Sequence, residues 1–235
     1  MADINVYQTL LDQELRLAKD DILILGSMVE QAILDSVRAL KEHDLEKSIT
    51  IFEGDKIVNS RRYEIEKFTL AIMATQQPTA RDLRMLTAIL DLSSELERMG
   101  DYAKGIAVIN LRSGGLGLTK LLRNLYDMSL KSVDMLHRSL TAFLLEDTDL
   151  AKAIIDEDNL VDDLYSQLYH DVLESVVDDP SNIERVNYVL WVGHNLERVA
   201  DRVTNVCERV IFVATGRMGE ISTHYTAYTY QSRDA

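Results

Sequence analysis

Two pairs of carboxylates, each with a spacing of four residues, are the side chains of this sequence best suited to chemistry. Glu97 and Asp101 form one pair, and Glu197 and Asp201 form the other. On a helix this spacing places both carboxylates of a pair on one face. Because like charges at this spacing repel each other, a cation bound between them would turn the repulsion into attraction. The two pairs therefore predict cation binding.

Oxygen-bearing side chains with the same spacing occur upstream of each pair. Asp55 precedes Asn59, and Asp158 precedes Asp162. If these segments lie on helices that face the downstream pairs, each site has three or four oxygen ligands, which suit magnesium, manganese, calcium or iron better than copper. A single acidic pair is common on a solvated helix face. The repetition of the whole arrangement favours binding sites over chance.

Three side chains next to the pairs are further candidates. Arg98 and Arg198 directly follow the glutamates, and their planar guanidinium groups are suited to a phosphate or a carboxylate of a partner protein. The alternative is that they pair with nearby acids of the same chain. His194 precedes Glu197 by one helical turn and is a possible nitrogen ligand, but Ser94 occupies the matching place in the first half. A hydrogen-bonded core histidine is therefore the default interpretation.

Other reactive residues give no indication of an enzyme. The single cysteine, Cys207, excludes a disulfide within one chain and any site built from several cysteines, and it is interpreted as a small buried side chain. Trp191 is interpreted as a packing residue. The sequence contains no glycine-rich phosphate loop, no GxSxG turn and no HExxH helix. The protein is therefore expected not to be an enzyme.

The elements that position these residues are long helices. Only ten glycines and two prolines occur among 235 residues, and this scarcity of turn formers favours an all-α fold. Apolar residues recur at intervals of three or four. The spacing predicts six helices, near 8–43, 45–74, 79–112, 119–145, 149–177 and 182–215. The glycine-rich segment 113–120 is predicted to be a linker.

The two halves of the chain repeat each other. Pro78 precedes the helix that carries LERMGD, and Pro180 precedes the helix that carries LERVAD, while DKIVN matches DNLVD upstream. Duplication of a three-helix unit explains these matches better than chance. The predicted organisation is a first unit at 1–114, a second unit at 115–217 and a flexible tail or contact arm at 218–235.

Charge and hydropathy limit the possible partners. The formal net charge of −14 repels phosphodiester backbones and anionic lipids, so direct binding of nucleic acid is disfavoured. No stretch approaches 18 uncharged apolar residues, and the amino terminus lacks the pattern of a signal peptide. A cytoplasmic protein without a membrane span is expected.

Over residues 8–217 the sequence resembles the PhoU family of phosphate-uptake regulators. The segments SELERMGDYAKGIA and HNLERVADRVTNVCERVIFVATGR are similar to the two signature helices of that family. The resemblance implies two tandem antiparallel three-helix bundles that carry metal ions on their surfaces, with iron, manganese, magnesium and zinc as candidates. The implied ligands are Asp55, Asn59, Glu97 and Asp101 in the first bundle, and Asp158, Asp162, Glu197 and Asp201 in the second. Because Asn59 lacks the charge of Asp162, the first site is expected to bind more weakly.

The resemblance also implies a function. Members of the family act as negative regulators that link the ATPase subunit of a phosphate-specific ABC transporter to a membrane sensor histidine kinase. A homodimer or higher homo-oligomer is expected. Two other classes stay open: a metal-free helical scaffold, and a ferritin-like di-metal enzyme, although the latter needs Glu-x-x-His motifs that the sequence lacks.

Overall fold

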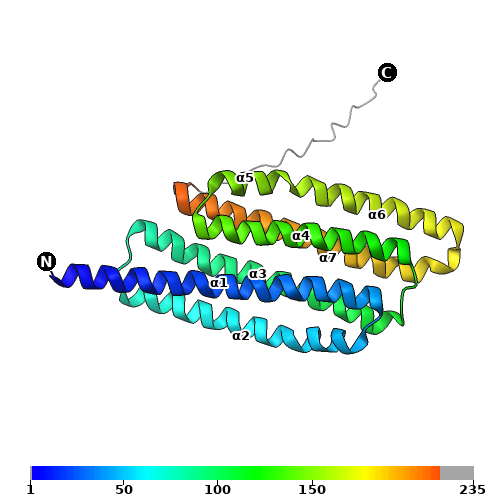
Figure 1. The fold of residues 1–235 in the computed structure, drawn as a ribbon, viewed down its shortest axis with the longest axis horizontal. Coiled ribbons are helices and arrows are strands. Elements are labelled where there is room, and N and C mark those ends of the chain that lie inside the picture. Colours follow the sequence, from blue (N-terminus) through cyan, green and yellow to red (C-terminus); the bar gives the residue numbers. More distant parts are fainter. Residues whose placement is uncertain (1, 218–235) are drawn as a thin grey trace, which may run out of the picture.

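The described part of the chain, residues 2–217 of a computed structural model, is entirely helical. The long helices of this part run roughly parallel to the long axis of the molecule (Figure 1). Their bounds are α1 Ala2–Glu42, α2 Leu45–Thr75, α3 Ala80–Ser113, α4 Thr119–Leu145, α5 Thr148–Asp156, α6 Asp158–Asp178 and α7 Ile183–Thr215, with a short 3-10 helix, η1, at Pro180–Asn182. The predicted all-α class is confirmed.

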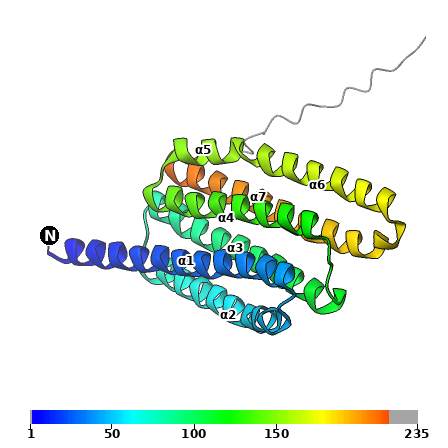
Figure 2. The ribbon, with the colours of Figure 1, turned by 45° about the vertical axis from the view of Figure 1, so that its right-hand side comes forward.

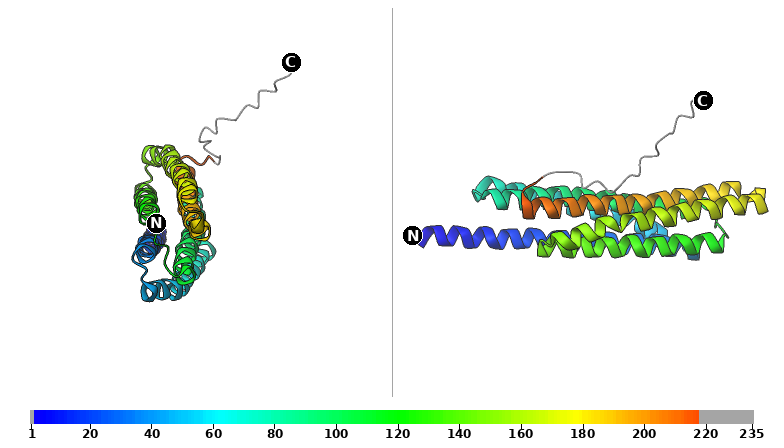
Figure 3. Two further views of the ribbon diagram at one scale, coloured as in Figure 1. Left: turned by 90° about the vertical axis from the view of Figure 1, so that its right-hand side faces the viewer. Right: turned by 90° about the horizontal axis from the view of Figure 1, so that it is seen from above.

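The helices form two bundles that lie side by side. In the first bundle α1, α2 and α3 pack on one another, and in the second α4 and α7 pack with α5 and α6. The bundles join through two contacts, α3 against α7 and α1 against α4 (Figures 1 and 2). Seen from above in Figure 3, α3 and α7 lie next to each other in one layer. The two helices that carry the repeated LER motif are thus direct neighbours.

One continuous apolar core fills both bundles. The periodic apolar residues of α1, among them Ile22, Leu25 and Val29, are fully buried in it. Gly26 lies where α1 meets α4, and a β-carbon there would collide with the side chain of Leu140. The absence of a side chain at this position therefore lets the two bundles approach closely.

The predicted fifth helix, 149–177, is interrupted at Glu157. The backbone N–H of Glu157 donates to the carbonyl of Ile154, and Leu160 donates to the carbonyl of Glu157, so a tight turn separates α5 from α6. The Glu157 carboxylate accepts hydrogen bonds from Lys131 and Arg138 on α4. These contacts tie the turn to the neighbouring helix, and apolar spacing alone gave no indication of them.

Several helix ends agree with the sequence and others differ. Thr79 and Asp82 form a capping box at the start of α3, and Gly216 ends α7 in the left-handed conformation. Pro180 begins the short helix η1, in which the backbone N–H of Ser181 donates to Asp179 Oδ1, and α7 begins directly after it at Ile183. α1 begins at residue 2 and not near 8. The predicted tail at 218–235 lies outside the described residues.

Within residues 2–217, no helix combines the length and apolar character that crossing a bilayer requires.

Candidate metal centre

The residues predicted as ligands lie in two clusters, one in each bundle. The first cluster, defined as Asp55 and Asn59 of α2 with Glu97 and Asp101 of α3, lies where these two helices pack. The second cluster, defined as Asp158 and Asp162 of α6 with Glu197 and Asp201 of α7, has the matching position in the second bundle. The four-residue spacing thus places oxygen-bearing side chains on facing helices, as predicted.

A lysine enters the first cluster. The Lys104 ammonium lies 2.7 Å from Asp55 Oδ2 and 3.6 Å from Asp101 Oδ1. Asn59 Nδ2 also donates to Asp55 Oδ2, over 3.1 Å. The Asp55 side chain is only 5% exposed, and its Oδ1 atom has no hydrogen-bond partner within the described chain. The ammonium of Lys104 therefore stands where the sequence predicts a bound cation.

A second positive charge acts on Glu97. Burial raises the pKa of the Glu97 carboxyl, and the charges of Asp101 and Asp55 raise it further. The guanidinium of Arg62, on α2, acts in the opposite direction and lowers this pKa. Lys104 and Arg62, together with the smaller influence of Arg98, therefore reduce the repulsion within the first cluster.

The second cluster lacks these positive charges. Burial, followed by the negative charges of Asp162, Asp201 and Glu197, raises the pKa of Asp158 to about 7. Burial and the charges of Asp201 and Asp162 likewise raise the pKa of Glu197 to about 7. Burial also raises the pKa values of Asp162 and Asp201, whose side chains are more exposed. Repulsion among these carboxylates thus makes full ionisation unfavourable at neutral pH.

The nearest arginines of α7 are engaged by α3. Arg198 Nε donates to the hydroxyl of Tyr102 over 3.2 Å, and an Arg202 guanidinium nitrogen lies 3.4 Å from Glu95 Oε2. Their charges lower the pKa of Asp201 without outweighing its burial. These side chains therefore connect the two bundles next to the second cluster, whose carboxylates form no ion pair with a lysine or arginine within residues 2–217.

His194 is not the core residue expected from the sequence. Its side chain is 53% exposed, and its Nδ1 atom lies 3.2 Å from Glu197 Oε2. The geometry of this contact does not make a hydrogen bond, so the buried Glu197 Oε2 atom has no hydrogen-bond partner in the described chain. The prediction of a core histidine is wrong because His194 lies on a part of the α7 surface that is open to solvent.

The other residues singled out in the sequence agree only in part with their predicted roles. Arg98 forms an ion pair with Glu95 over 3.2 Å, as the pairing alternative expected, whereas Arg198 is held by a tyrosine hydroxyl. Cys207 is buried, and burial raises the pKa of its thiol to about 12, in agreement with the sequence interpretation. Trp191 contradicts its interpretation as a packing residue, since it is 65% exposed.

The two clusters differ in how well they suit a metal ion. Among residues 2–217, no group of three or more histidine, cysteine, aspartate and glutamate side chains is already arranged to hold a metal. The second cluster nevertheless offers four carboxylates, with an unpartnered oxygen on Glu197, which is the donor chemistry of a hard divalent cation. In the first cluster the ammonium of Lys104 competes for the same oxygens.

Sequence reasoning overlooked the basic residues of the first cluster. When the two repeats are aligned on their shared motifs, Lys104 matches Thr204 and Arg62 matches Tyr165. Thr204 donates to the backbone carbonyl of Asp201, and the pKa of Tyr165 is raised by burial and then by the nearby charge of Glu197. The basic residues of the first repeat and their uncharged counterparts in the second are therefore visible in the sequence, close to the predicted ligands.

Comparison with known proteins agrees with this duplicated geometry. The family model described as the PhoU domain matches the chain twice, over residues 22–109 and 125–210. The chain belongs to the PhoU family. Each matched segment contains one of the two carboxylate clusters, so the internal repeat corresponds to two PhoU domains.

Relatives within the PhoU family match over most of their length. A "phosphate-specific transport system accessory protein PhoU homolog" of Clostridium acetobutylicum is 31% identical over 212 residues, which are 90% of this chain and 97% of the relative. The accessory protein PhoU of Escherichia coli is 32% identical over 204 residues, 87% of this chain and 85% of the relative. The family thus contains accessory proteins of phosphate transport.

Solved PhoU structures share the fold. The phosphate transport system regulatory protein PhoU of Streptococcus pneumoniae has a TM-score of 0.81 at 30% identity, covering 90% of this chain and all of its own. PhoU of Pseudomonas aeruginosa has a TM-score of 0.80 at 28% identity, covering 88% of this chain and 99% of its own. The two tandem three-helix repeats are therefore the PhoU fold.

Proposed function

We propose that this protein is a cytoplasmic regulatory accessory protein of a phosphate transport system. The observation that carries the proposal is the match of both repeats to PhoU domains, together with relatives that cover almost the whole chain and are named as accessory proteins of phosphate-specific transport. The role is non-enzymatic: the protein binds the transporter ATPase subunit and a sensor histidine kinase, and restrains uptake and starvation signalling while phosphate is plentiful. A homodimer or higher homo-oligomer is part of this proposal.

The second cluster is the proposed metal site. Asp158, Asp162, Glu197 and Asp201 would hold a divalent cation such as manganese, iron, magnesium or zinc, which would neutralise their mutual repulsion. The first cluster is proposed to hold Lys104 in place of such an ion. This sharpens the sequence prediction, which expected a weaker site there and not an internal cation.

A metal ion at the second cluster would join α6 to α7 and so fix the surface that these helices offer to a partner. The chemistry that the ion supplies is charge neutralisation. The chain's own contribution is positional, because Lys131 and Arg138 hold Glu157, the residue directly before Asp158, and thereby set where α6 begins.

A binding experiment tests both parts of the proposal. Purified protein is immobilised, and its affinity for the transporter ATPase subunit and for the cytoplasmic part of the kinase is measured with Mn²⁺ and with a chelator. We expect binding to both partners, tighter with Mn²⁺, and we expect Glu197→Ala with Asp201→Ala to remove the metal effect. Equal affinities with and without metal would leave a metal-free scaffold, and no binding to either partner would contradict the regulatory role.

A further inference from the structure

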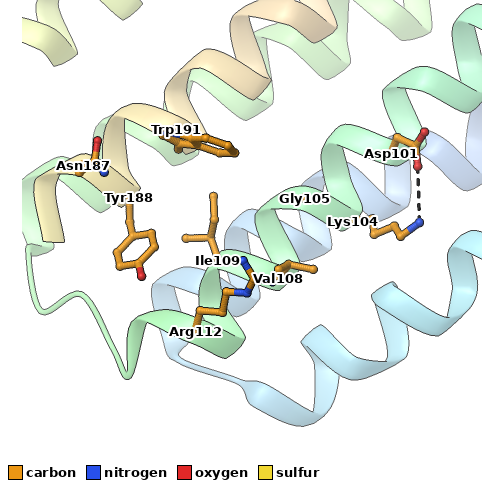
Figure 4. Close-up of a pocket in the computed structure, with 9 residues that line it drawn as sticks. All are labelled: Asp101, Lys104, Gly105, Val108, Ile109, Arg112, Asn187, Tyr188 and Trp191. Carbon is orange, nitrogen blue, oxygen red and sulfur yellow. Dashed lines mark ion pairs between the residues drawn. The ribbon is translucent and has the colours of Figure 1, made fainter. Parts of the chain in front are cut away.

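A groove between the two bundles adjoins the first carboxylate cluster at one end and extends away from it along α3 and α7. It lies between the carboxyl-terminal half of α3 and the first turns of α7, and it encloses about 450 Å³. Figure 4 shows Trp191 and Tyr188 of α7 and Ile109 and Arg112 of α3 pointing toward the same space. Asp101 and Lys104 stand at one end of the groove, and Gly105 forms part of its floor.

The groove is apolar and contains a large exposed aromatic residue. Trp191 is 65% exposed and stands beside other apolar side chains of the groove. Together they form an apolar surface onto which a partner could pack. Tryptophan, tyrosine and arginine are the residue types that most often dominate binding at protein interfaces. Trp191, Tyr188 and Arg112 bring all three types together here.

The charged side chains that line the groove favour a ligand that carries a negative charge. Lys104 lies 2.7 Å from Asp55 and 3.6 Å from Asp101, so it is already paired. Arg112 is exposed, and it has no ion pair or hydrogen bond from its side chain within residues 2–217. In a molecule with a formal net charge of −14, this groove therefore offers one unpaired positive charge next to an apolar surface.

The shape of the groove fits a helix. The α3 residues that line it extend from Asp101 to Arg112 with the three- and four-residue intervals of a single helix face. The eleven steps from the first to the last of these residues span about 16 Å of helix, which is close to three turns. A third helix laid along two packed helices is a common way in which a protein groove accepts a partner segment.

We propose that this groove is the docking site for an amphipathic helix of a partner protein, whose apolar side chains pack on Trp191, Tyr188 and Ile109 while one carboxylate pairs with Arg112. The inference rests on the proposed function only in requiring that a partner protein exists. One carboxylate beside an apolar stripe is favoured over a strongly acidic helix, because the net charge of the whole molecule repels the latter.

The single tryptophan of the chain makes the site measurable. The probe is a synthetic 14-residue helical peptide without aromatic residues, with leucines on one face, one glutamate beside them, and alanine and glutamine elsewhere. Two matched peptides carry glutamine or lysine in place of the glutamate. Titration of the full-length protein is followed by the fluorescence emission of Trp191.

We expect the glutamate peptide to shift Trp191 emission to shorter wavelength in a saturable manner. The glutamine peptide should bind roughly five- to tenfold more weakly, since it lacks the charge-assisted bond, and the lysine peptide more weakly still. Arg112→Glu should reverse this order, so that the lysine peptide binds best. Such a reversal requires the peptide to lie beside residue 112.

A change in the floor of the groove supplies a second test that does not threaten the fold. A β-carbon at Gly105 would meet only Asn195 Nδ2, at 3.6 Å, which is an ordinary van der Waals contact, so the helix backbone accepts a β-carbon there. Gly105→Leu should abolish peptide binding by filling the groove. Gly105→Ala is the matched control, and it should keep most of the binding while it favours the helix.

Four results would overturn the proposal. These are no emission change with any peptide, equal affinity for all three peptides, a change of emission on dilution of the protein alone, and a change on removal of residues 218–235 alone. The third result would place a second copy of the chain in the groove, and the fourth would place the chain's own tail there. Binding of the transporter ATPase subunit or the kinase is measured separately, so failure of the groove and failure of the regulatory role are distinguishable.

Discussion

In the first cluster an ammonium group stands 2.7 Å from Asp55, whereas at the matching place in the second cluster α7 carries the hydroxyl of Thr204. Both clusters occupy the same position in a repeated three-helix bundle. In the first, Lys104 offsets part of the negative charge, while in the second burial and like charge raise the pKa values of Asp158 and Glu197 to about 7. Three of the four carboxylates of the second cluster thus have counterparts in the first, but the two clusters differ in their charge environment.

From the difference between the two clusters, we expect the largest loss of stability when Lys104 is removed. Lys104→Ala leaves the buried carboxylate of Asp55 without its cation, and we expect a loss of unfolding free energy of about 2–4 kcal/mol. Urea denaturation at pH 7.5 measures this value. The matched control is Thr204→Ala in the second cluster, for which we expect a change within about 0.5 kcal/mol. Equal effects of the two substitutions would contradict this difference between the clusters.

The turn before the second cluster should contribute less. Glu157 accepts hydrogen bonds from Arg138 and Lys131, which hold the pKa of its carboxyl at about 2. Because this pKa is lowered, the stabilisation is complete above about pH 4.5 and is lost as the pH falls toward 2. Glu157→Gln should therefore destabilise the protein by about 1–2 kcal/mol at pH 7. Thermal unfolding at pH 7 and at pH 3 should show a smaller difference between variant and parent at the lower pH.

The pH dependence of the second cluster has the opposite sign. The folded pKa values of Asp158 and Glu197 lie above their unfolded values, so the folded state holds more protons between about pH 4 and 7. Stability in the absence of metal should therefore fall as the pH rises through this interval. Asp158→Asn with Glu197→Gln should stabilise the metal-free protein at pH 7.5 by about 1–2 kcal/mol, a value reduced for solvent screening.

The control for this measurement comes from the first cluster. Burial and neighbouring acids also raise the pKa of Glu97, but Arg62 opposes the shift. Glu97→Gln should therefore change the slope of stability against pH less than the double substitution does. A larger change of slope from Glu97→Gln would show that the clusters do not differ as described.

The smallest effect is expected at Gly54, which matches Glu157 when the two repeats are aligned. Gly54 lies inside the unbroken helix α2, and a β-carbon there would meet nothing within 4 Å. Gly54→Ala should raise the unfolding free energy by about 0.5–1 kcal/mol through its greater helix propensity. The same unfolding assay measures it, and a destabilised variant would mean that α2 needs flexibility at this point.

The sequence was sufficient for the features that depend on periodicity and repetition. The helices, the pairing of repeats and the carboxylates on facing helices follow from intervals of three or four residues and from the duplicated LER motif. The break at Glu157 was missed because it depends on ion pairs with α4, which are distant in sequence. The exposure of Trp191 was missed because a helical apolar pattern does not show whether a neighbour covers that face.

We propose that a metal ion belongs to the second cluster and not to the first. The most direct measurement is the metal-to-protein ratio after equilibration with Mn²⁺ and removal of free ion, for the parent and for two matched variants, Glu97→Ala with Asp101→Ala and Glu197→Ala with Asp201→Ala. We predict that the first variant retains the ratio of the parent and that the second variant loses its metal. Metal retained by the second variant and lost by the first would show that the first cluster holds the ion.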